Sequence, residues 1–130
     1  MTTRRVLQPG PDHPITLQPL GSRVVVTVGG QTIAASDRAI ILQEAAYPPV
    51  IYIPRQDARM GLLVRSAQVS YCPYKGEASY FSIPAGGTRS DNAVWTYEAP
   101  FQAVANIKEH LAFYPDRVDT IAYGPARPKR

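Results

Sequence analysis

The chain has 130 residues, 13 prolines, one cysteine and a formal net charge of +4 at neutral pH. This length fits a single domain, because two separate cores would each bury too little surface. The frequent prolines exclude long helices and coiled coils. One cysteine excludes an internal disulfide framework and a zinc site built from several cysteines. No segment reaches the roughly 18 consecutive apolar residues of a membrane-spanning helix.

The positive charge lies at the two ends of the chain. Residues 1–14 sum to +1 and residues 123–130 to +3, whereas residues 15–122 hold nine basic and nine acidic side chains. A nucleic-acid-binding domain normally carries a basic stripe on its folded surface, so we expect no nucleic-acid partner. We predict a flexible arm over residues 1–14 with an exposed His13, one β domain over 15–122 and a basic tail over 123–130. Because residues 1–10 contain no apolar signal segment, we expect a cytoplasmic protein without a membrane partner.

Alternating and β-branched residues predict about eight short strands. In chain order they cover residues 23–28, 31–35, 38–43, 50–53, 67–71, 77–83, 93–97 and 117–123. Residues 15–19 are compatible with a further, short edge strand, because proline is tolerated at a sheet edge. Gly29-Gly30 between two of these runs predicts a tight hairpin. Residues 72–76 predict a turn, because proline and glycine occupy turn positions. Residues 84–92 form a polar, glycine-rich loop in this prediction.

Two segments predict helical structure. Pro54 followed by polar residues favours a short helix or helical turn within residues 54–63. Pro100 is expected to open one α-helix over residues 100–111, in which Phe101, Val104, Ile107 and Leu111 share an apolar face. The fold class is therefore mainly β: a small domain of bent or curled antiparallel sheets, with the α-helix covering one side.

Four segments, in order and spacing, resemble a known family. They are PPVIYIPRQD (48–57), CPYKGEASYFS (72–82), AVWTY (93–97) and HLAFYPDRVD (110–119). The chain resembles the domain-of-unknown-function family numbered 427, which also carries a nucleotidyltransferase label, over about residues 22–121. The resemblance implies a strongly bent β domain of the beta-tent type. The family commonly has a histidine where this chain has Tyr71, and relatives in this architecture often carry zinc on paired cysteines, which Cys72 alone cannot provide.

Aromatic residues with polar tips indicate a small-ligand pocket. Alternation places Tyr80 and Ser82 on one face of their strand, and Trp95 and Tyr97 on one face of theirs. If the two faces meet, these four side chains line a cavity of the kind that binds small molecules. The alternative is an amphipathic core whose hydroxyl groups are satisfied by the backbone.

Basic residues near turns suggest contacts to an anionic ligand. Lys75 follows Tyr74 in the turn at residues 72–76, and Arg55 lies four residues before Arg59 on the predicted helical turn. Arg117 lies close to His110 in the sequence. We therefore predict ligand contacts from Arg55, Tyr74, Lys75 and Arg117 as well as from the aromatic set. The alternative for Arg55 and Arg59 is a solvated face of the helical turn, with Asp57 as counter-charge.

Two residues are candidates for catalysis. Cys72 could be a nucleophile activated by Lys75, or a small buried hydrophobic residue. His110 could be an acid or base, or a protonated cap at the end of the predicted helix. Nucleotidyl transfer with two metal ions needs acidic residues that can share those ions, usually at positions i and i+2 of a strand, and no two acidic residues of this chain have that spacing. The sequence also contains no phosphate-binding loop. We expect neither cofactor nor metal. The leading prediction is a binding domain for a small, anionic ligand; the alternatives are an enzyme and an interaction domain whose tails dock a partner.

Overall fold

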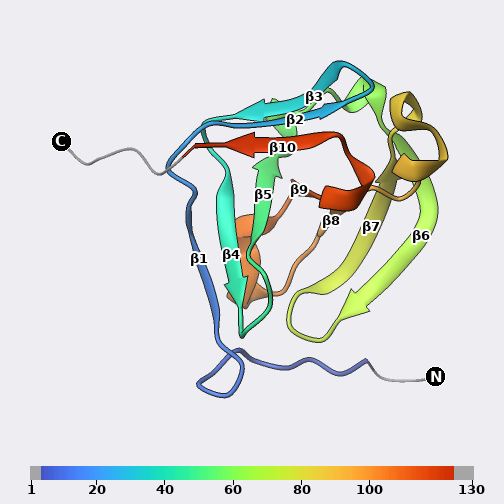
Figure 1. Cartoon of the computed structure of the whole chain (residues 1–130). Helices are drawn as coiled ribbons and strands as arrows, with labels where there is room; N and C mark the ends of the chain where they lie inside the picture. The colour runs from blue at the N-terminus through green and yellow to red at the C-terminus, as the bar shows by residue number, and fades with distance from the viewer. Residues whose placement is uncertain (1–3, 125–130) are drawn as a thin grey trace.

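A computed structural model describes residues 4–124, which form ten strands in two antiparallel sheets (Figure 1). The larger sheet has the order β1 (Ile15–Pro19), β4 (Ile40–Glu44), β5 (Val50–Pro54), β9 (His110–Phe113), β8 (Val94–Thr96), β7 (Gly76–Ser82) and β6 (Val64–Cys72). The smaller sheet has the order β10 (Thr120–Tyr123), β2 (Val24–Val28) and β3 (Gln31–Ser36). The larger sheet curves strongly without closing, since β1 and β6 remain its edges (Figure 1). The mainly-β prediction is confirmed.

The valine-rich segment forms the centre of the smaller sheet. Val24, Val26 and Val28 of β2 are fully buried, whereas the residues between them are partly exposed, as alternation along a half-buried strand requires. Gly29 and Gly30 both have positive φ angles, 59° and 77°, and join β2 to β3. Glycine adopts this backbone conformation without steric cost, so the predicted tight hairpin is confirmed.

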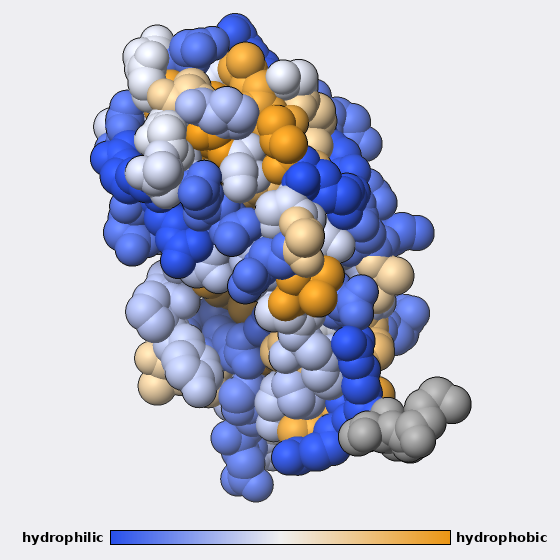
Figure 2. Space-filling model, turned by 90° about the vertical axis from the view of Figure 1, so that its right-hand side faces the viewer, coloured by the Kyte–Doolittle hydropathy of each residue, from blue (hydrophilic) through white to orange (hydrophobic). Residues whose placement is uncertain are grey.

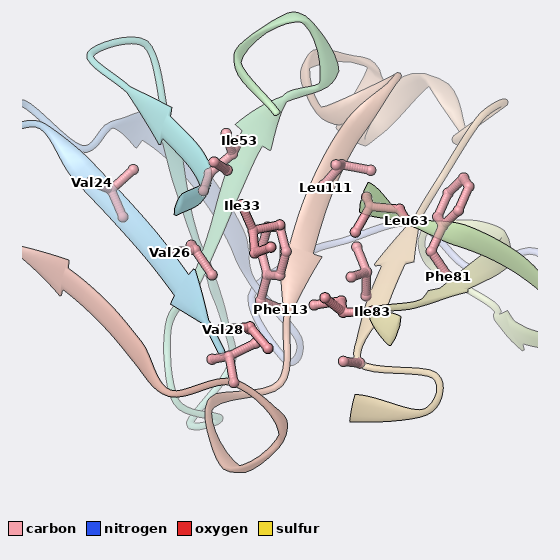
Figure 3. Packing of buried hydrophobic residues seen from close by; sticks show 14 of the residues in the cluster. Val24, Val26, Val28, Ile33, Ile53, Leu63, Phe81, Ile83, Leu111 and Phe113 are labelled. Atoms are coloured by element: carbon pink, nitrogen blue, oxygen red, sulfur yellow. The ribbon is translucent and has the colours of Figure 1, made fainter. Parts of the chain in front are cut away.

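The main core lies between the two sheets (Figure 3). The smaller sheet contributes Val24, Val26, Val28 and Ile33, the larger sheet contributes Ile53, Leu111, Phe113 and Phe81, and Ile83 follows the end of β7. Each of these side chains is at most 6% exposed. Their burial supplies most of the hydrophobic stabilisation that holds one sheet on the other.

A second apolar cluster covers the opposite face of the larger sheet. In β5, Tyr52 belongs to this cluster, whereas its neighbour Ile53 belongs to the main core. In β9, Ala112 and Leu111 divide in the same way. Because successive residues of a strand point to opposite faces, the larger sheet is apolar on both sides. The candidate site lies on this second face.

The α-helix expected over residues 100–111 is absent, and this prediction was wrong. Residues Gln102–Ile107 form the 3₁₀ segment η4, in which Val104 has non-helical angles (φ −126°, ψ 30°), and β9 begins at His110. Val104 and Ile107 pack in the second cluster, but Leu111 packs in the main core. The apolar spacing that predicted one helix therefore comes from two different elements. Val104 and Ile107 are separated by the three-residue repeat of a 3₁₀ helix, whereas Leu111 belongs to a strand.

Short 3₁₀ segments occupy several other predicted turns. The helical turn after Pro54 is confirmed as η1 (Arg55–Asp57) and η2 (Met60–Leu62), and η3 (Pro84–Ser90) replaces the expected loop. The last strand begins at Thr120, because η5 (Pro115–Arg117) occupies the start of the predicted run. Among residues 4–124, no helix has the length and apolar content needed to cross a membrane.

Residues 4–14 pack against the β domain rather than standing apart from it. The Leu7 amide donates a hydrogen bond to the Pro73 carbonyl over 2.9 Å, and Arg4 pairs with Glu77 at 3.0 Å. The segment crosses from the β6–β7 hairpin to the start of β1 (Figure 1). Residues 125–130, most of the predicted basic tail, lie outside the described residues.

The edge strand β6 forms an exposed side of the molecule. Val64 and Val69 in this strand are 55% and 58% exposed. Figure 2 views the molecule from this side, where hydrophilic side chains separate the apolar patches. Its pairing with β7 is interrupted between Arg65 and Val69, and such an irregularity hinders edge-to-edge pairing with another chain.

Candidate functional site

A cavity of about 210 Å³ lies on the second face of the larger sheet. Six aromatic side chains line it: Tyr47, Tyr52, Tyr80, Trp95, Tyr97 and Tyr114. Leu42, Pro48 and Val50 complete the apolar wall, and Glu44 and Lys75 are its two charged residues. We call this space the Trp95 cavity.

Strand register brings the central rings of the cavity together. Tyr80 of β7 lies directly opposite Trp95 of β8, so their side chains project from the same face. The indole N–H of Trp95 donates to the Tyr52 hydroxyl over 3.3 Å, and the two rings meet edge to face. The Tyr114 ring lies 4.5 Å from the Trp95 ring, centroid to centroid. The indole is therefore fixed between β5 and the end of β9.

Three tyrosine hydroxyls of the cavity, those of Tyr52, Tyr97 and Tyr114, have a raised pKa. Burial raises the pKa of both Tyr52 and Tyr97. Burial and a hydrogen bond with Tyr80 raise the pKa of Tyr114 to about 12. The Tyr80 hydroxyl also shares a 2.8 Å hydrogen bond with Ser70. With their raised pKa values, Tyr52, Tyr97 and Tyr114 act as neutral hydrogen-bonding groups.

A buried chain of charged groups forms one side of the cavity. The Lys75 ammonium donates to one carboxylate oxygen of Glu44, and Nε2 of His13 lies 2.7 Å from the other oxygen. Burial opposes ionisation of Glu44, but the hydrogen bonds from Lys75 and His13 outweigh it and hold the pKa of Glu44 below its usual range. Lys75 is only 8% exposed. Within residues 4–124, Glu44 is the one hydrogen-bond partner of the Lys75 ammonium, so its remaining N–H groups are available to a ligand.

His13 is a support of this chain, and its prediction as a solvent-exposed residue was wrong. Its imidazole stacks on the Tyr74 ring with centroids 3.9 Å apart and planes within 5°. Its side chain is 23% exposed. The N-terminal segment thus reaches the site through His13, and Tyr74 contributes by holding this imidazole.

Four of the predicted ligand contacts come together in the Trp95 cavity: Lys75, Tyr80, Trp95 and Tyr97. The other predicted contacts do not line it. Ser82, predicted to share the cavity face with Tyr80, instead accepts the Asn92 amide with its hydroxyl over 2.9 Å. The Arg117 guanidinium lies over the outer part of the site, 4.5 Å from the centroid of the Tyr114 ring.

Arg55 belongs to a separate ionic cluster. It pairs with Glu98 at 3.2 Å and with Glu109 at 3.4 Å, and Arg65 binds the same Glu98 carboxylate at 2.7 Å. No helix spans both Arg55 and Arg59, because η1 ends at Asp57. Arg55 and Arg59 therefore do not share a helical face from which both could bind one anion.

The two catalytic candidates lie outside the lining of the cavity. Cys72 is partly buried at the end of β6, where it packs against the second apolar cluster. His110 is the first residue of β9, and its Nδ1 lies 2.8 Å from the Lys108 carbonyl oxygen. The alternative role of His110, as a protonated cap at the end of an α-helix, is excluded because the preceding segment is a 3₁₀ helix that ends at Ile107.

Sequence reasoning missed Glu44, Tyr52 and Tyr114. Val50 and Tyr52 alternate on β5 as Leu42 and Glu44 do on β4, so the sequence does contain a signal for a shared face. That signal could not be connected to Trp95, because β9 (His110–Phe113), the strand between β5 and β8, was not predicted: its first two residues fell in the predicted helix and its last two in no predicted element.

Acidic side chains elsewhere are held by arginines. Asp57 pairs with Arg38 at 3.0 Å, and Asp119 pairs with Arg89. In the described part of the chain, no three His, Cys, Asp or Glu side chains come together as candidate metal ligands. The arrangement offers no cluster of carboxylates of the kind that two-metal phosphoryl chemistry uses.

The fold and the cavity define a small mainly-β domain with an aromatic cavity on one face of a bent, open sheet. Residues 16–124 match the model of the family described as "Domain of unknown function (DUF427)", and the chain belongs to this family. The matched region contains all ten strands apart from the first residue of β1. No curated protein shows significant similarity to the chain.

Proposed function

We propose that this chain binds a small anionic ring compound in the Trp95 cavity. The observation that carries the proposal is the combination of six aromatic side chains with a buried, ion-paired lysine around one cavity. Ring faces with a few polar groups at defined positions are typical of small-molecule sites.

The size of the cavity limits the ligand. A cavity of about 150 Å³ can hold one benzene ring, and the Trp95 cavity measures about 210 Å³. It therefore accommodates one six-membered ring with a short substituent. Pockets for larger, drug-sized ligands usually measure about 300–1,000 Å³.

The charged residues of the cavity, Lys75 and Glu44, determine which substituent the ring of the ligand carries. Both carboxylate oxygens of Glu44 are engaged, by Lys75 and by His13. The ammonium of Lys75 retains donor N–H groups, and a buried donor without an acceptor costs free energy. A carboxylate on the ligand supplies that acceptor. Because the charges of Lys75 and Glu44 cancel, recognition depends on this hydrogen bond rather than on a strongly positive field.

Benzoate is the probe that tests the proposal, with benzyl alcohol as its neutral match. A ligand that binds the folded state raises the melting temperature by mass action, so benzoate at millimolar concentration should raise Tm by several degrees and benzyl alcohol by much less. Leu42→Phe fills the cavity and should abolish the shift. Val69→Phe, on the exposed edge of β6, should leave it unchanged.

Nucleoside triphosphates with magnesium form the competing arm of the same screen. A shift with nucleotide and none with benzoate would overturn the proposal in favour of the nucleotidyl-transfer label. The absence of any shift with benzoate at millimolar concentration would also contradict it.

A further inference from the structure

A second, larger hollow opens between β10 and the strands β5 and β9. Its volume is about 620 Å³, about four times the cavity that holds one benzene ring. The residues that bound it include Ile51, Ile53, Phe113, Pro115, Ile121 and Tyr123. We call it the Ile121 hollow. None of its lining residues carries a charge.

The Ile121 hollow adjoins the Trp95 cavity. Four residues line both spaces: Tyr47, Pro48, Val50 and Trp95. These residues come from the β4–β5 connection, the start of β5 and the centre of β8. A ligand seated beside Trp95 therefore touches residues that also line the second space, and these shared residues are where a longer ligand would pass from one space to the other.

The two spaces differ in chemistry. The Trp95 cavity has the Lys75–Glu44 pair and tyrosine hydroxyls, whereas the Ile121 hollow offers aliphatic, proline and aromatic surface. Tyr47 and Tyr123, at the hollow, are among the large apolar side chains that stay more than half exposed, at 62% and 52%. Exposed apolar surface of this kind commonly marks a binding site.

We propose that the ligand is amphipathic: its anionic ring occupies the Trp95 cavity and an apolar tail occupies the Ile121 hollow. The class is that of ring carboxylic acids with an alkyl or aryl substituent on the side of the ring away from the carboxylate. This inference rests on the proposed function, since Lys75 anchors the head. It adds the tail, for which the cavity alone has no room.

A series of 4-alkylbenzoates tests the tail separately from the head. Dissociation constants are measured by Trp95 fluorescence for benzoate and its 4-methyl, 4-ethyl, 4-butyl and 4-hexyl derivatives. Burial of each methylene should tighten binding about fourfold once the chain passes Trp95. Ile121→Phe narrows the hollow and should remove this dependence on length while benzoate itself still binds. Val69→Phe, on the exposed edge of β6, is the matched control and should preserve it, and both variants keep Trp95 as the single tryptophan.

The outcomes separate the two proposals. Benzoate binding with no gain along the series overturns the amphipathic ligand and leaves the proposed function standing. Loss of all binding overturns both. A gain along the series that emerges only in a chain shortened after Gly124 means that residues 125–130 fill the hollow, which also overturns the inference.

Discussion

Tyr80 and Trp95 lie directly opposite each other on neighbouring antiparallel strands, and their rings enter the same cavity. This pairing joins a polar aromatic pair to the buried Lys75–Glu44 ion pair within one space. The stability of the site and its selectivity for a ligand both depend on these contacts. Each contact can be changed separately by mutation.

The Lys75–Glu44 pair should show strong coupling in a double-mutant cycle. Lys75→Met leaves the partly buried Glu44 carboxylate with His13 as its remaining partner and should lower the free energy of unfolding by about 1–3 kcal/mol. The double variant Lys75→Met/Glu44→Met replaces the pair by apolar side chains and should be near the wild type. Urea unfolding measures all four corners of the cycle. Simple additivity of the two single changes would contradict a buried pair.

Acid should remove the contribution of Glu44. Its pKa in the folded state is lowered from the ordinary value of 4.5, so the stabilisation is present above that value and disappears as the pH falls through the lower folded value. Glu44→Gln should therefore be least stable relative to wild type at neutral pH, and the gap should narrow below about pH 4. For comparison, Glu77→Gln removes an exposed pair with Arg4, 51% exposed on the glutamate side, and should change stability little at any pH. A gap for Glu44→Gln that is constant with pH would refute the assignment.

Alkaline titration should divide the tyrosines into two groups. The pKa of Tyr114 is raised to about 12, and burial raises those of Tyr52 and Tyr97 as well. Because a raised phenol pKa favours the protonated folded state, stability should fall as the pH climbs above the ordinary value of 10.0. Ultraviolet absorbance should show three of the eight tyrosines ionising late, together with unfolding. Ionisation of all eight in one step before unfolding would be inconsistent with the burial of Tyr52 and Tyr97.

Gly86 should tolerate no side chain. A Cβ there would lie 1.9 Å from Ser90 Oγ and 2.8 Å from Val28 Cγ1, and Ser90 is fully buried while it donates to the Arg117 carbonyl over 2.7 Å. Gly86→Ala should cost about 1–3 kcal/mol through overpacking. Gly61→Ala, with no atom within 4 Å of the new Cβ, should be close to neutral. Thermal unfolding compares the two, and equal effects would refute the close packing at η3.

The sequence predicted elements whose pattern is local. Four valines and the following Gly29-Gly30 determine β2 and its hairpin by alternation and positive φ angles. The same alternation placed Tyr80 and Trp95 on faces that could meet, and strand register brings them together. Lys75 was found because it lies in the turn that precedes β7.

Features that depend on distant pairing could not be predicted. Ile107 and Leu111 resemble one helix face in the sequence, but they belong to opposite sides of the larger sheet. Glu44 meets Lys75, and His13 meets Glu44, only because β4 and the N-terminal segment approach the β6–β7 turn. Arg55, a plausible anion contact by type, is instead neutralised by Glu98 and Glu109.

The chain has a single tryptophan, and this makes the central claim directly measurable. A ¹⁵N–¹H correlation spectrum shows one indole N–H, that of Trp95, which donates to Tyr52 inside the cavity. Titration with benzoate should shift this resonance in a saturable way in the wild type and in Val69→Phe, but not in Leu42→Phe. An indole resonance that stays fixed while benzoate perturbs other parts of the spectrum would contradict binding in the Trp95 cavity.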